Sequence, residues 1–543
     1  MLLRNIRPKT NLFLQSRRFH GERYGPYPYV DLGEGNREQF PVLNPANGEE
    51  LCQIVSSSSE DVKAAVQNAQ AVFESGVWSK ASVLHRSKVL SNLARALERK
   101  IPEFAVMETM QTGRTIREMN VQLGRLPEWL SDYYAALLRT TNAYVAPTQG
   151  KLLNYVQRAP LGVVAQITPF NHPLLIAIKK IAPALAAGNS VIVKPSELAP
   201  ITVLEFAELA AEAGIPEGVL TILPGLGPVT GREIVEHPLI RKADITASTQ
   251  TGRSIGRIVG GNLASFTAEL GGKVISIASE GLTQRGTQAP IVIFNDADLI
   301  SSVNGAAFAA FIASGQTCVS GTRILIQNDI YDTFMSLFTE KVESIKRRMG
   351  NPLNPRSTMG TVISMNHLKR IEEMVMHTSG KIILGGGRMT GTSDLDGFDF
   401  SSGSFYSPTV IVDIEIEDEL WQEEIFGPVV VVRKFQDEAE GIALANSCKY
   451  GLGAGIWTSD LSRAHRVAAE IQAGLCWVNT HHRNDPSSPW GGMKESGIGR
   501  ENGLEAFHAY SHTKSTIVNV APPEETRSSD DWFSDSPEGK RYG

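Results

Sequence analysis

The sequence predicts an α/β protein in which two regions of alternating strands and helices form two separate sheets. In the first region, apolar runs at Leu161–Ile167, Ser190–Lys194 and Val219–Leu223 are strand candidates separated by amphipathic stretches. A second alternating region runs from Pro290 to about Asn479. Alternation of this kind is typical of doubly wound parallel sheets. The length of 543 residues exceeds what one core holds, so we expect two or three domains.

The segments around these strands have helical or strand periodicity. Residues 59–120 carry apolar side chains at helical spacing, and we expect further helices over Pro173–Ala187 and Ile201–Ala213. Tyr510–Val520 alternates as a strand does and is a candidate for pairing across a subunit interface. Because parallel sheets bind ligands beyond the carboxyl ends of their strands, we expect a cofactor at the loops that follow the first-region strands.

Composition excludes several classes of protein. The net charge of −6 and the lack of a long basic run argue against a nucleic-acid partner. No uninterrupted apolar run reaches about 18 residues, which argues against a membrane span. The cysteines are few and scattered, which indicates a reducing compartment and argues against a zinc site, so we expect no metal. They are Cys52, Cys318, Cys448 and Cys476.

The two chain ends differ in character. The first 21 residues carry five basic residues and no acid, which suits a mitochondrial presequence, but Pro8 weakens the helix that a presequence needs. We therefore favour the cytoplasm, with the mitochondrial matrix as the alternative. The stretch 521–543 is rich in Pro, Ser, Glu and Asp and is typical of a flexible, solvated tail.

Three segments carry candidate reactive side chains, each with a structural alternative. Cys318 follows a small-residue helix; it is either buried packing or, if a helix N-terminus lowers its pKa, a nucleophile. Glu269 ends a strand before a double glycine and is either a surface carboxylate or a base. Asn171 stands before Pro173 and is either a helix N-cap or an oxyanion donor.

Two further segments suit a nucleotide. Lys194 and Glu197 follow a strand, where both side chains can hydrogen-bond ribose hydroxyls, and the acid favours NAD over NADP. The alternative is a salt-bridged surface pair. The glycine-rich turn that contains Gly227 leads into a helix, but it lacks the GxGxxG pattern and is weak evidence alone.

Taken together, these segments resemble the aldehyde dehydrogenase superfamily. ITPFNHP, VIVKPSE, AELGGK, GQTC, EEIFGPV and PWGGMKESGIGRENG occur in family order, and the likeness runs from about Phe19 to Val520. The resemblance implies that the Cys318 thiolate attacks an aldehyde, that the Asn171 amide and the Cys318 backbone N–H hold the oxyanion, and that Glu269 activates the water that hydrolyses the thioester. A Glu at position 269 argues against the CoA-acylating branch.

The resemblance also implies the cofactor contacts. Lys194 and Glu197 would hold the adenosine ribose, Glu424 the nicotinamide ribose, and Ser248 the pyrophosphate, with Phe426 near the ring. Ile167, Thr168, Gly227 and Leu270 would complete the NAD site. Lys180 and Glu501 would assist proton transfer.

The fold implied by the resemblance has three parts. Residues 10–137 and 161–272 would form a Rossmann-like NAD-binding domain, and 289–500 a second α/β catalytic domain. Residues 138–160 and 505–520 would form a small β bridging and oligomerisation element. Family members are usually homodimers or homotetramers.

The sequence departs from the family pattern at two places. The phosphate turn reads Ala247-Ser248 instead of Gly-Ser, and we favour simple packing for the added methyl group. Residues 274–288 are an anomalous insertion, since the family pattern resumes at Ala289 when they are removed. We hypothesise that they are a translated intron; the alternative is a real loop, which would displace Glu269 and slow the enzyme.

The substrate is predicted least sharply. His172, Thr317, His482, Arg483 and Trp490 should line or neighbour the aldehyde tunnel. This set is polar and partly cationic, which favours an acidic or hydroxylated aldehyde with Arg483 as the anion partner; the alternative is that Arg483 faces solvent. A semialdehyde or betaine-aldehyde dehydrogenase is the narrower alternative. A catalytically silent scaffold is the other class, favoured only by the insertion.

Overall fold

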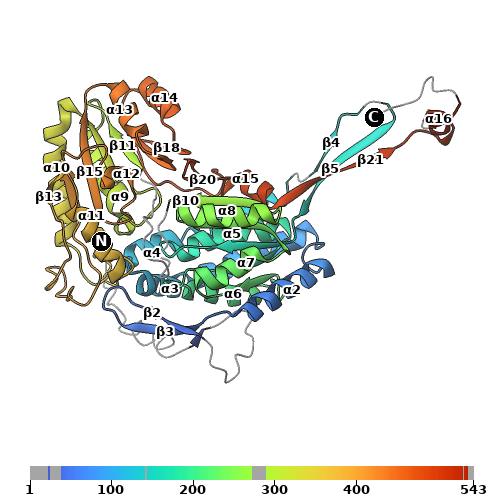
Figure 1. Cartoon of the computed structure of the whole chain (residues 1–543), viewed down its shortest axis with the longest axis horizontal. Coiled ribbons are helices and arrows are strands. Elements are labelled where there is room, and N and C mark those ends of the chain that lie inside the picture. The colour runs from blue at the N-terminus through green and yellow to red at the C-terminus, as the bar shows by residue number, and fades with distance from the viewer. Residues whose placement is uncertain are drawn as a thin grey trace, which may run out of the picture.

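The computed structural model contains two α/β bodies and a long β arm that projects from one of them (Figure 1). It describes residues 23–24, 38–140, 143–148, 150–271, 289–529 and 531–535. The proposed presequence and the anomalous insertion lie outside these residues. No helix among the described residues is long and apolar enough to cross a membrane.

The first body is built on a six-stranded sheet with the order β20-β10-β9-β6-β7-β8. All neighbours are parallel except β20, which runs antiparallel to β10. The strands are β6 (Val163–Ile167), β7 (Ser190–Lys194), β8 (Leu220–Ile222), β9 (Ile240–Ala247), β10 (Ser265–Leu270) and β20 (Gly497–Ile498). The predicted parallel sheet is therefore present, and its last strand comes from the far end of the sequence.

Alternate side chains of these strands bury two faces. Val164 and Val191 pack against one group of helices, whereas Val163 and Ile192 pack on the opposite face. The first group is α3 (Val83–Thr112), α5 (Pro173–Ala187) and α6 (Ile201–Glu212); the second face carries α2 (Ser59–Ser75), α7 (Arg232–Glu236) and α8 (Thr249–Gly261). Strands buried on both faces explain the continuous apolar runs in the sequence.

The second body is built on a seven-stranded sheet with the order β13-β14-β15-β12-β11-β17-β18. Its strands are β11 (Pro290–Ile293), β12 (Arg323–Gln327), β13 (Lys381–Leu384), β14 (Thr409–Val412), β15 (Val429–Phe435), β17 (Gly453–Trp457) and β18 (Leu475–Val478). The helices α9 (Leu299–Phe311) and α10 (Tyr331–Arg347) cover one face; α11 (Met365–Met376), α12 (Glu419–Gln422), α13 (Glu438–Asn446) and α14 (Leu461–Glu470) cover the other.

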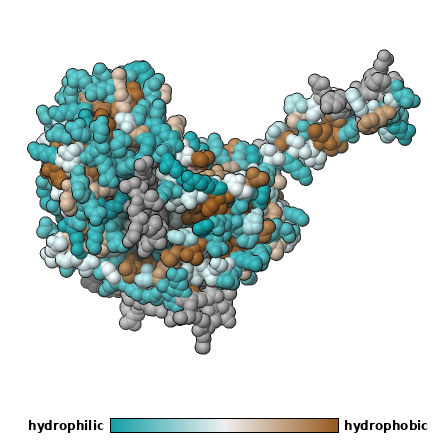
Figure 2. All heavy atoms as spheres, in the orientation of Figure 1, coloured by the Kyte–Doolittle hydropathy of each residue, from teal (hydrophilic) through white to brown (hydrophobic). Residues whose placement is uncertain are grey.

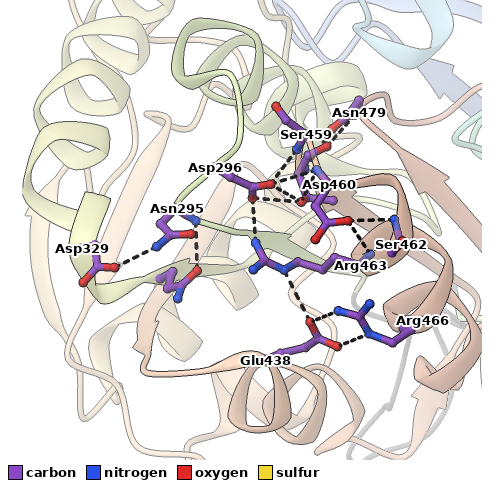
Figure 3. A network of polar contacts seen from close by, with 12 residues as sticks. Asn295, Asp296, Asp329, Glu438, Ser459, Asp460, Ser462, Arg463, Arg466 and Asn479 are labelled. Atoms are coloured by element: carbon purple, nitrogen blue, oxygen red, sulfur yellow. Dashed lines mark hydrogen bonds and ion pairs between the residues drawn. The ribbon is translucent and has the colours of Figure 1, made fainter.

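A polar network fixes the carboxyl end of β11 to α14 (Figure 3). The Asp296 carboxylate accepts hydrogen bonds from the Thr458 hydroxyl at 2.8 Å and from the Asp460 backbone N–H at 2.9 Å. The Arg463 guanidinium donates to the same carboxylate at 2.8 Å and lies 3.4 Å from Glu438. These contacts hold the start of α14 against the end of β11.

The projecting arm is an antiparallel sheet of β4 (Ala143–Ala146), β5 (Leu152–Pro160) and β21 (Ser511–Asn519) in the order β21-β5-β4. Brown, hydrophobic spheres are visible along the arm in Figure 2. Its large exposed apolar and aromatic side chains include Tyr144, Val145, Leu153, Ile517 and Val518. The predicted strand at Tyr510–Val520 is β21. Within the stretch predicted to be a tail, α16 (Pro523–Ser529) follows the arm, and its Glu525 pairs with Lys151.

The helical stretch predicted over residues 59–120 is divided into α2, α3 and α4 (Ile116–Leu123). Gly76 and Gly113 end α2 and α3 in left-handed conformations, with φ of 83° and 73°. Ser58, Ser82 and Thr115 then cap the three N-termini through their hydroxyl groups. Glycine and hydroxyl signals divide what apolar periodicity alone treats as one helix.

The remaining elements are short. They are β1 (Arg23–Tyr24), β2 (Gln39–Leu43), β3 (Glu50–Val55), η2 (Glu128–Ala135), η3 (Gly227–Gly231), η4 (Ile312–Gly315), η5 (Asn328–Ile330), β16 (Tyr450–Gly451), β19 (Met493–Lys494) and α15 (Gly503–Ala509). Of these, η4 matters most for the site because it leads directly into Cys318.

Candidate active site

Cys318 lies in the loop between η4 and β12. Before it, Ala313 and Ser314 both adopt left-handed conformations with φ of 54°, which is uncommon for residues with a side chain. Gly315 follows with φ of 70°, and a Cβ there would lie 2.1 Å from the Gly427 carbonyl oxygen. The loop is therefore pressed against the segment that contains Glu424 and Phe426. The N-terminus of α5 lies beside this loop, because its N-cap residue His172 contacts Thr317, the residue before Cys318.

The Cys318 thiol donates a hydrogen bond to Glu269. The Sγ atom lies 3.1 Å from Oε1, and both side chains are buried. Burial, followed by the nearby Glu269 carboxylate, raises the pKa of the Cys318 thiol well above its ordinary value. The thiol is therefore protonated at rest, and Glu269 is the acceptor within reach of its proton. The sequence left open that Cys318 is only packing and that Glu269 lies on the surface. Neither alternative accounts for a hydrogen bond between two buried side chains.

Glu269 stands near the end of β10, where it pairs in register with Gly497 of β20. Trp490 donates from Nε1 to its Oε1 at 3.0 Å, and the carboxyl group also shares a hydrogen bond with Glu501. Burial, followed by the charge of Glu501, raises the pKa of Glu269 to about 7. The carboxyl group therefore changes its charge near neutral pH.

Two buried lysines on α5 surround Glu501. Lys179 Nζ lies 2.9 Å from Glu501 Oε2, and Lys180 pairs with Glu501 and with Asp244. Although burial alone would raise the pKa of Glu501, the two ammonium groups hold it well below its ordinary value. Lys179 also lies 4.6 Å from the centre of the Trp490 ring, on the same side of the site as Glu269. The sequence pointed to Lys180 and Glu501; the contacts of Lys179 add a second cation.

Asn171 is not the N-cap of α5. His172 occupies that position, with Pro173 in the first turn. Instead the Asn171 side chain is buried and donates from Nδ2 to the Gln316 backbone carbonyl at 2.9 Å, in the loop before Cys318. This contact fixes the amide beside the thiol and leaves its second N–H to point elsewhere.

His172 and Thr317 join the same cluster. His172 Nε2 lies 3.2 Å from Thr317 Oγ1, and its Nδ1 lies 2.6 Å from Arg114 Nη1 and 2.9 Å from Gln122 Nε2. Burial, followed by the charge of Arg114, lowers the pKa of His172 well below its ordinary value, so the ring is neutral. Arg114 was missed from the sequence, because nothing in the local pattern marks one arginine as buried.

The predicted substrate residues after β18 divide into two groups. Trp490 is buried against Glu269, and the His482 ring lies 6.1 Å from both the Trp490 and His172 rings. The Arg483 side chain, in contrast, is exposed to solvent, and its Nε lies 3.4 Å from Thr480 Oγ1. His481 is buried and bonds to the Val319 carbonyl at 2.7 Å, which is a structural contact.

Several residues predicted to bind the cofactor, with Lys194 and Glu197 assigned to the adenosine ribose, follow the carboxyl ends of β6, β7 and β8. Lys194 Nζ lies 3.1 Å from Glu197 Oε2, and both side chains are buried, so this is not a surface pair. Thr168 follows Ile167; its backbone N–H donates to the Lys194 carbonyl, and its buried Oγ1 has no hydrogen-bond partner among the described residues. Gly227 opens η3 with no atom within 4 Å of a Cβ position.

The remaining predicted cofactor residues lie on other elements. Ser248 is the N-cap of α8 and accepts a hydrogen bond from the Thr251 backbone at 3.2 Å. Leu270 ends β10, directly after Glu269. Glu424 is buried, and the Phe426 ring meets Phe170 edge to face at 5.7 Å, which places this segment beside Asn171. Within the described ranges, no group of three His, Cys, Asp or Glu residues is arranged to hold a metal ion.

Comparisons with known proteins identify the family of the chain. The aldehyde dehydrogenase family model matches residues 32–516. A Burkholderia cenocepacia protein provisionally assigned as an aldehyde dehydrogenase is 39% identical, with a TM-score of 0.83 over 91% of this chain and 97% of that chain. Betaine aldehyde dehydrogenase from Staphylococcus aureus, solved with NAD+, is 32% identical, with a TM-score of 0.86 over 94% and 97%. A mutant of P. syringae indole-3-acetaldehyde dehydrogenase, solved with NAD+ and IAA, is 32% identical, with a TM-score of 0.86 over 94% and 99%. The chain therefore belongs to the aldehyde dehydrogenase family, as its motifs predicted.

Proposed function

We propose that this aldehyde dehydrogenase uses NAD to oxidise an aldehyde to a carboxylic acid, with Cys318 as the nucleophile and Glu269 as the general base. The single observation that carries the assignment is the 3.1 Å contact between the Cys318 thiol and a Glu269 carboxylate oxygen, both buried. A thiol needs a base to become a nucleophile, and a carboxyl group with a pKa of about 7 suits that task at neutral pH.

In the first step, Glu269 takes the Cys318 proton while Sγ forms a bond to the aldehyde carbon. The carbonyl oxygen becomes an oxyanion, which the second Asn171 amide proton and the Cys318 backbone N–H stabilise. The contact between Asn171 and the Gln316 carbonyl supports this role, because it sets the amide in place before substrate arrives. The product of this step is a hemithioacetal on Cys318.

The residues at the carboxyl ends of β6 and β7 fit NAD. The buried Lys194–Glu197 pair offers a donor and an acceptor for ribose hydroxyls, Thr168 has a buried hydroxyl oxygen without a partner among the described residues, and Gly227 leaves room for close approach. When bound, NAD would supply the acceptor for a hydride, whose loss from the hemithioacetal gives a thioester. Glu424, Phe426, Ile167, Ser248 and Leu270 are proposed to complete its contacts.

Glu269 first releases the proton that it took from Cys318 and is ionised again; in the last step it takes a proton from a water molecule that attacks the thioester and releases the acid and the Cys318 thiolate. The hydrogen bond that the Glu269 carboxyl group shares with Glu501 supports this role, because it gives the proton a path away from Glu269. Lys179, Lys180 and Glu501 adjoin Glu269 and are proposed to carry the proton away from the site.

The test is NADH formation with an aldehyde panel. The wild-type enzyme should form NADH, and Cys318→Ser should lose about 10⁴-fold in kcat/KM, since the nucleophile acts as a unit with its base. Cys448→Ser is the matched control, because Cys448 is another buried free thiol outside the site. A Cys318→Ser enzyme as active as the control would overturn the assignment, and an inactive wild type would support the silent-scaffold alternative.

We further propose a homodimer or homotetramer located in the cytoplasm. The exposed apolar side chains of the β arm support self-association, and the free state of Cys52, Cys318, Cys448 and Cys476 supports a reducing compartment. Light scattering of the purified enzyme tests the assembly, where a monomer would contradict it. Fluorescence imaging of the tagged chain tests the location, and colocalisation with mitochondria would favour the matrix.

A further inference from the structure

A large cavity opens between the two α/β bodies, with a volume of about 750 Å³. We call it the entrance cavity; its walls come from α4 of the first body, from α9 and α10 of the second, and from the loop 482–484. Cavities of 300–1,000 Å³ suit ligands the size of a drug molecule, so the volume far exceeds what a short-chain aldehyde fills.

The walls of the entrance cavity are strongly cationic. They include Arg114, Arg117, Arg125, Lys341, Arg348 and Arg483, against one carboxylate among the described lining residues, Glu118. Glu118 already pairs with Arg114 at 3.1 Å, and Arg125 pairs with Glu128 outside the wall at 2.8 Å. Arg117, Lys341 and Arg483 have no ion pair with any residue that the structure describes. A net positive charge therefore faces the cavity.

Apolar side chains fill the space between these cations. Val121, Leu175, Phe308, Phe311 and Ile312 all line the entrance cavity. A cavity that combines apolar walls with several cations matches a ligand that has an apolar segment and an anionic group. A small, purely polar aldehyde would leave these apolar walls in water.

The entrance cavity is linked to Cys318 through two residues, His172 and Thr317, neither of which lines it. Arg114, Gln122 and His482 line it and also contact or face His172. His172 in turn bonds to Thr317, the residue before Cys318. A second cavity shares Arg125, Arg483 and Asn484 with the first and reaches Trp490, which bonds to Glu269. An aldehyde that reaches the thiol from this side passes the cations.

We propose that the entrance cavity binds an aldehyde that carries a carboxylate at the far end of an apolar chain or ring, held by Arg117, Lys341 and Arg483. This rests on the proposed function and names its substrate class. It extends the anion-binding role, expected for Arg483 alone, to a group of side chains from three separate elements. The same charge disfavours a cationic substrate such as betaine aldehyde.

The first experiment compares kcat/KM for a medium-chain ω-carboxy aldehyde, its neutral methyl ester and betaine aldehyde. We expect the acid to exceed the ester by about tenfold at low salt, with betaine aldehyde below both, and the preference to shrink at ~1 M salt, where the Debye length is about 3 Å. Equal values for acid and ester would overturn the proposal while leaving the enzyme assignment intact. No NADH with any of the three would instead count against both.

The second experiment locates the preference. In Arg117→Gln/Lys341→Gln, the ratio of acid to ester should fall at least about threefold, as expected for the loss of two partly exposed charges. Lys346→Gln is the matched control, because Lys346 lies on α10 as Lys341 does but is exposed and does not line the cavity. A ratio that falls equally in the control, or in neither variant, would show that the anion is held elsewhere.

Discussion

Two carboxylates at the ends of strands behave in opposite ways. Asp296 follows β11 and receives donors from Thr458, Ser459, Asp460 and Arg463 (Figure 3), which together overcome the effect of burial and lower its pKa. Glu269 stands near the end of β10, receives hydrogen bonds from Cys318 and Trp490, and shares a third with the acid Glu501. Burial and a neighbouring acid therefore raise its pKa to about 7.

The difference shows how one chemical group is assigned to structure or to reaction. A carboxylate surrounded by donors is permanently charged and fixes its neighbours in place. A buried carboxylate with few donors is poised between its two charge states, at a cost in stability, and can move protons. Burial, together with the number of donors around each acid, separates the two roles: Glu269 is buried, whereas Asp296 is partly exposed.

The largest expected effect comes from removing the reactive carboxylate. Glu269→Gln should lower kcat by about 10³-fold, because neither the thiol nor the hydrolytic water then has a base. Rapid-mixing measurement of NADH, with quenched-flow mass spectrometry for a thioester on Cys318, separates the two steps. Full turnover in Glu269→Gln would show that another group is the base and that the different pKa values of Glu269 and Asp296 do not reflect different roles.

The next effect is the dependence of activity on pH. Glu269 acts as a base only when ionised, so kcat/KM should rise with pH through about 7 and be about a hundredfold lower at pH 5 than on its plateau. Because the folded-state pKa is raised, burial of Glu269 lowers stability only as pH rises above about 4.5, the ordinary value of the group. Asp296, with a lowered pKa, contributes stability that is lost only below its ordinary value of 3.8. At pH 5 the enzyme should therefore be slow but still folded by circular dichroism. If instead the protein unfolds with the same pH midpoint as the loss of activity, unfolding and not protonation of Glu269 explains that loss.

A smaller effect is expected for the structural carboxylate. Asp296→Ala should lower the free energy of unfolding by about 1–2 kcal/mol, because the buried Thr458 hydroxyl and the more exposed donors of Asp460 and Arg463 lose an acceptor that is itself partly exposed. Urea denaturation measures the change. The kcat of the folded variant should match wild type, and a large loss of kcat without loss of stability would reverse the roles assigned to the two acids.

The smallest effect is expected from the second buried lysine. Lys179→Met keeps the length of the side chain but removes a cation that favours the ionised form of Glu269, so the acid limb of the pH profile should move up by about one unit. Lys346→Met serves as the control. If the acid limb of the pH profile is unchanged and only the Tm falls, Lys179 is a structural partner of Glu501.

Local signals predicted the elements that carry the site, and tertiary contacts account for what the sequence missed. Pro173 at the first turn and Gly188 at the end mark α5, whose bounds were predicted as they stand, and β7 likewise follows its apolar run. The motifs identified Cys318 and Glu269 individually. Neither the donors around Asp296 nor the burial of Arg114 has a local signal, because each depends on residues that are distant in the chain.

The edge strand β20 has a consequence for how the chain is made. Glu269 lies on β10, whose outer edge is closed by Gly497 and Ile498. While the chain emerges from the ribosome, the first sheet can assemble through β10, but that edge stays open until the second body has been synthesised. A nascent or truncated chain would therefore present an unpaired β-strand that carries the proposed base Glu269, and we expect such chains to require chaperones and to aggregate without them.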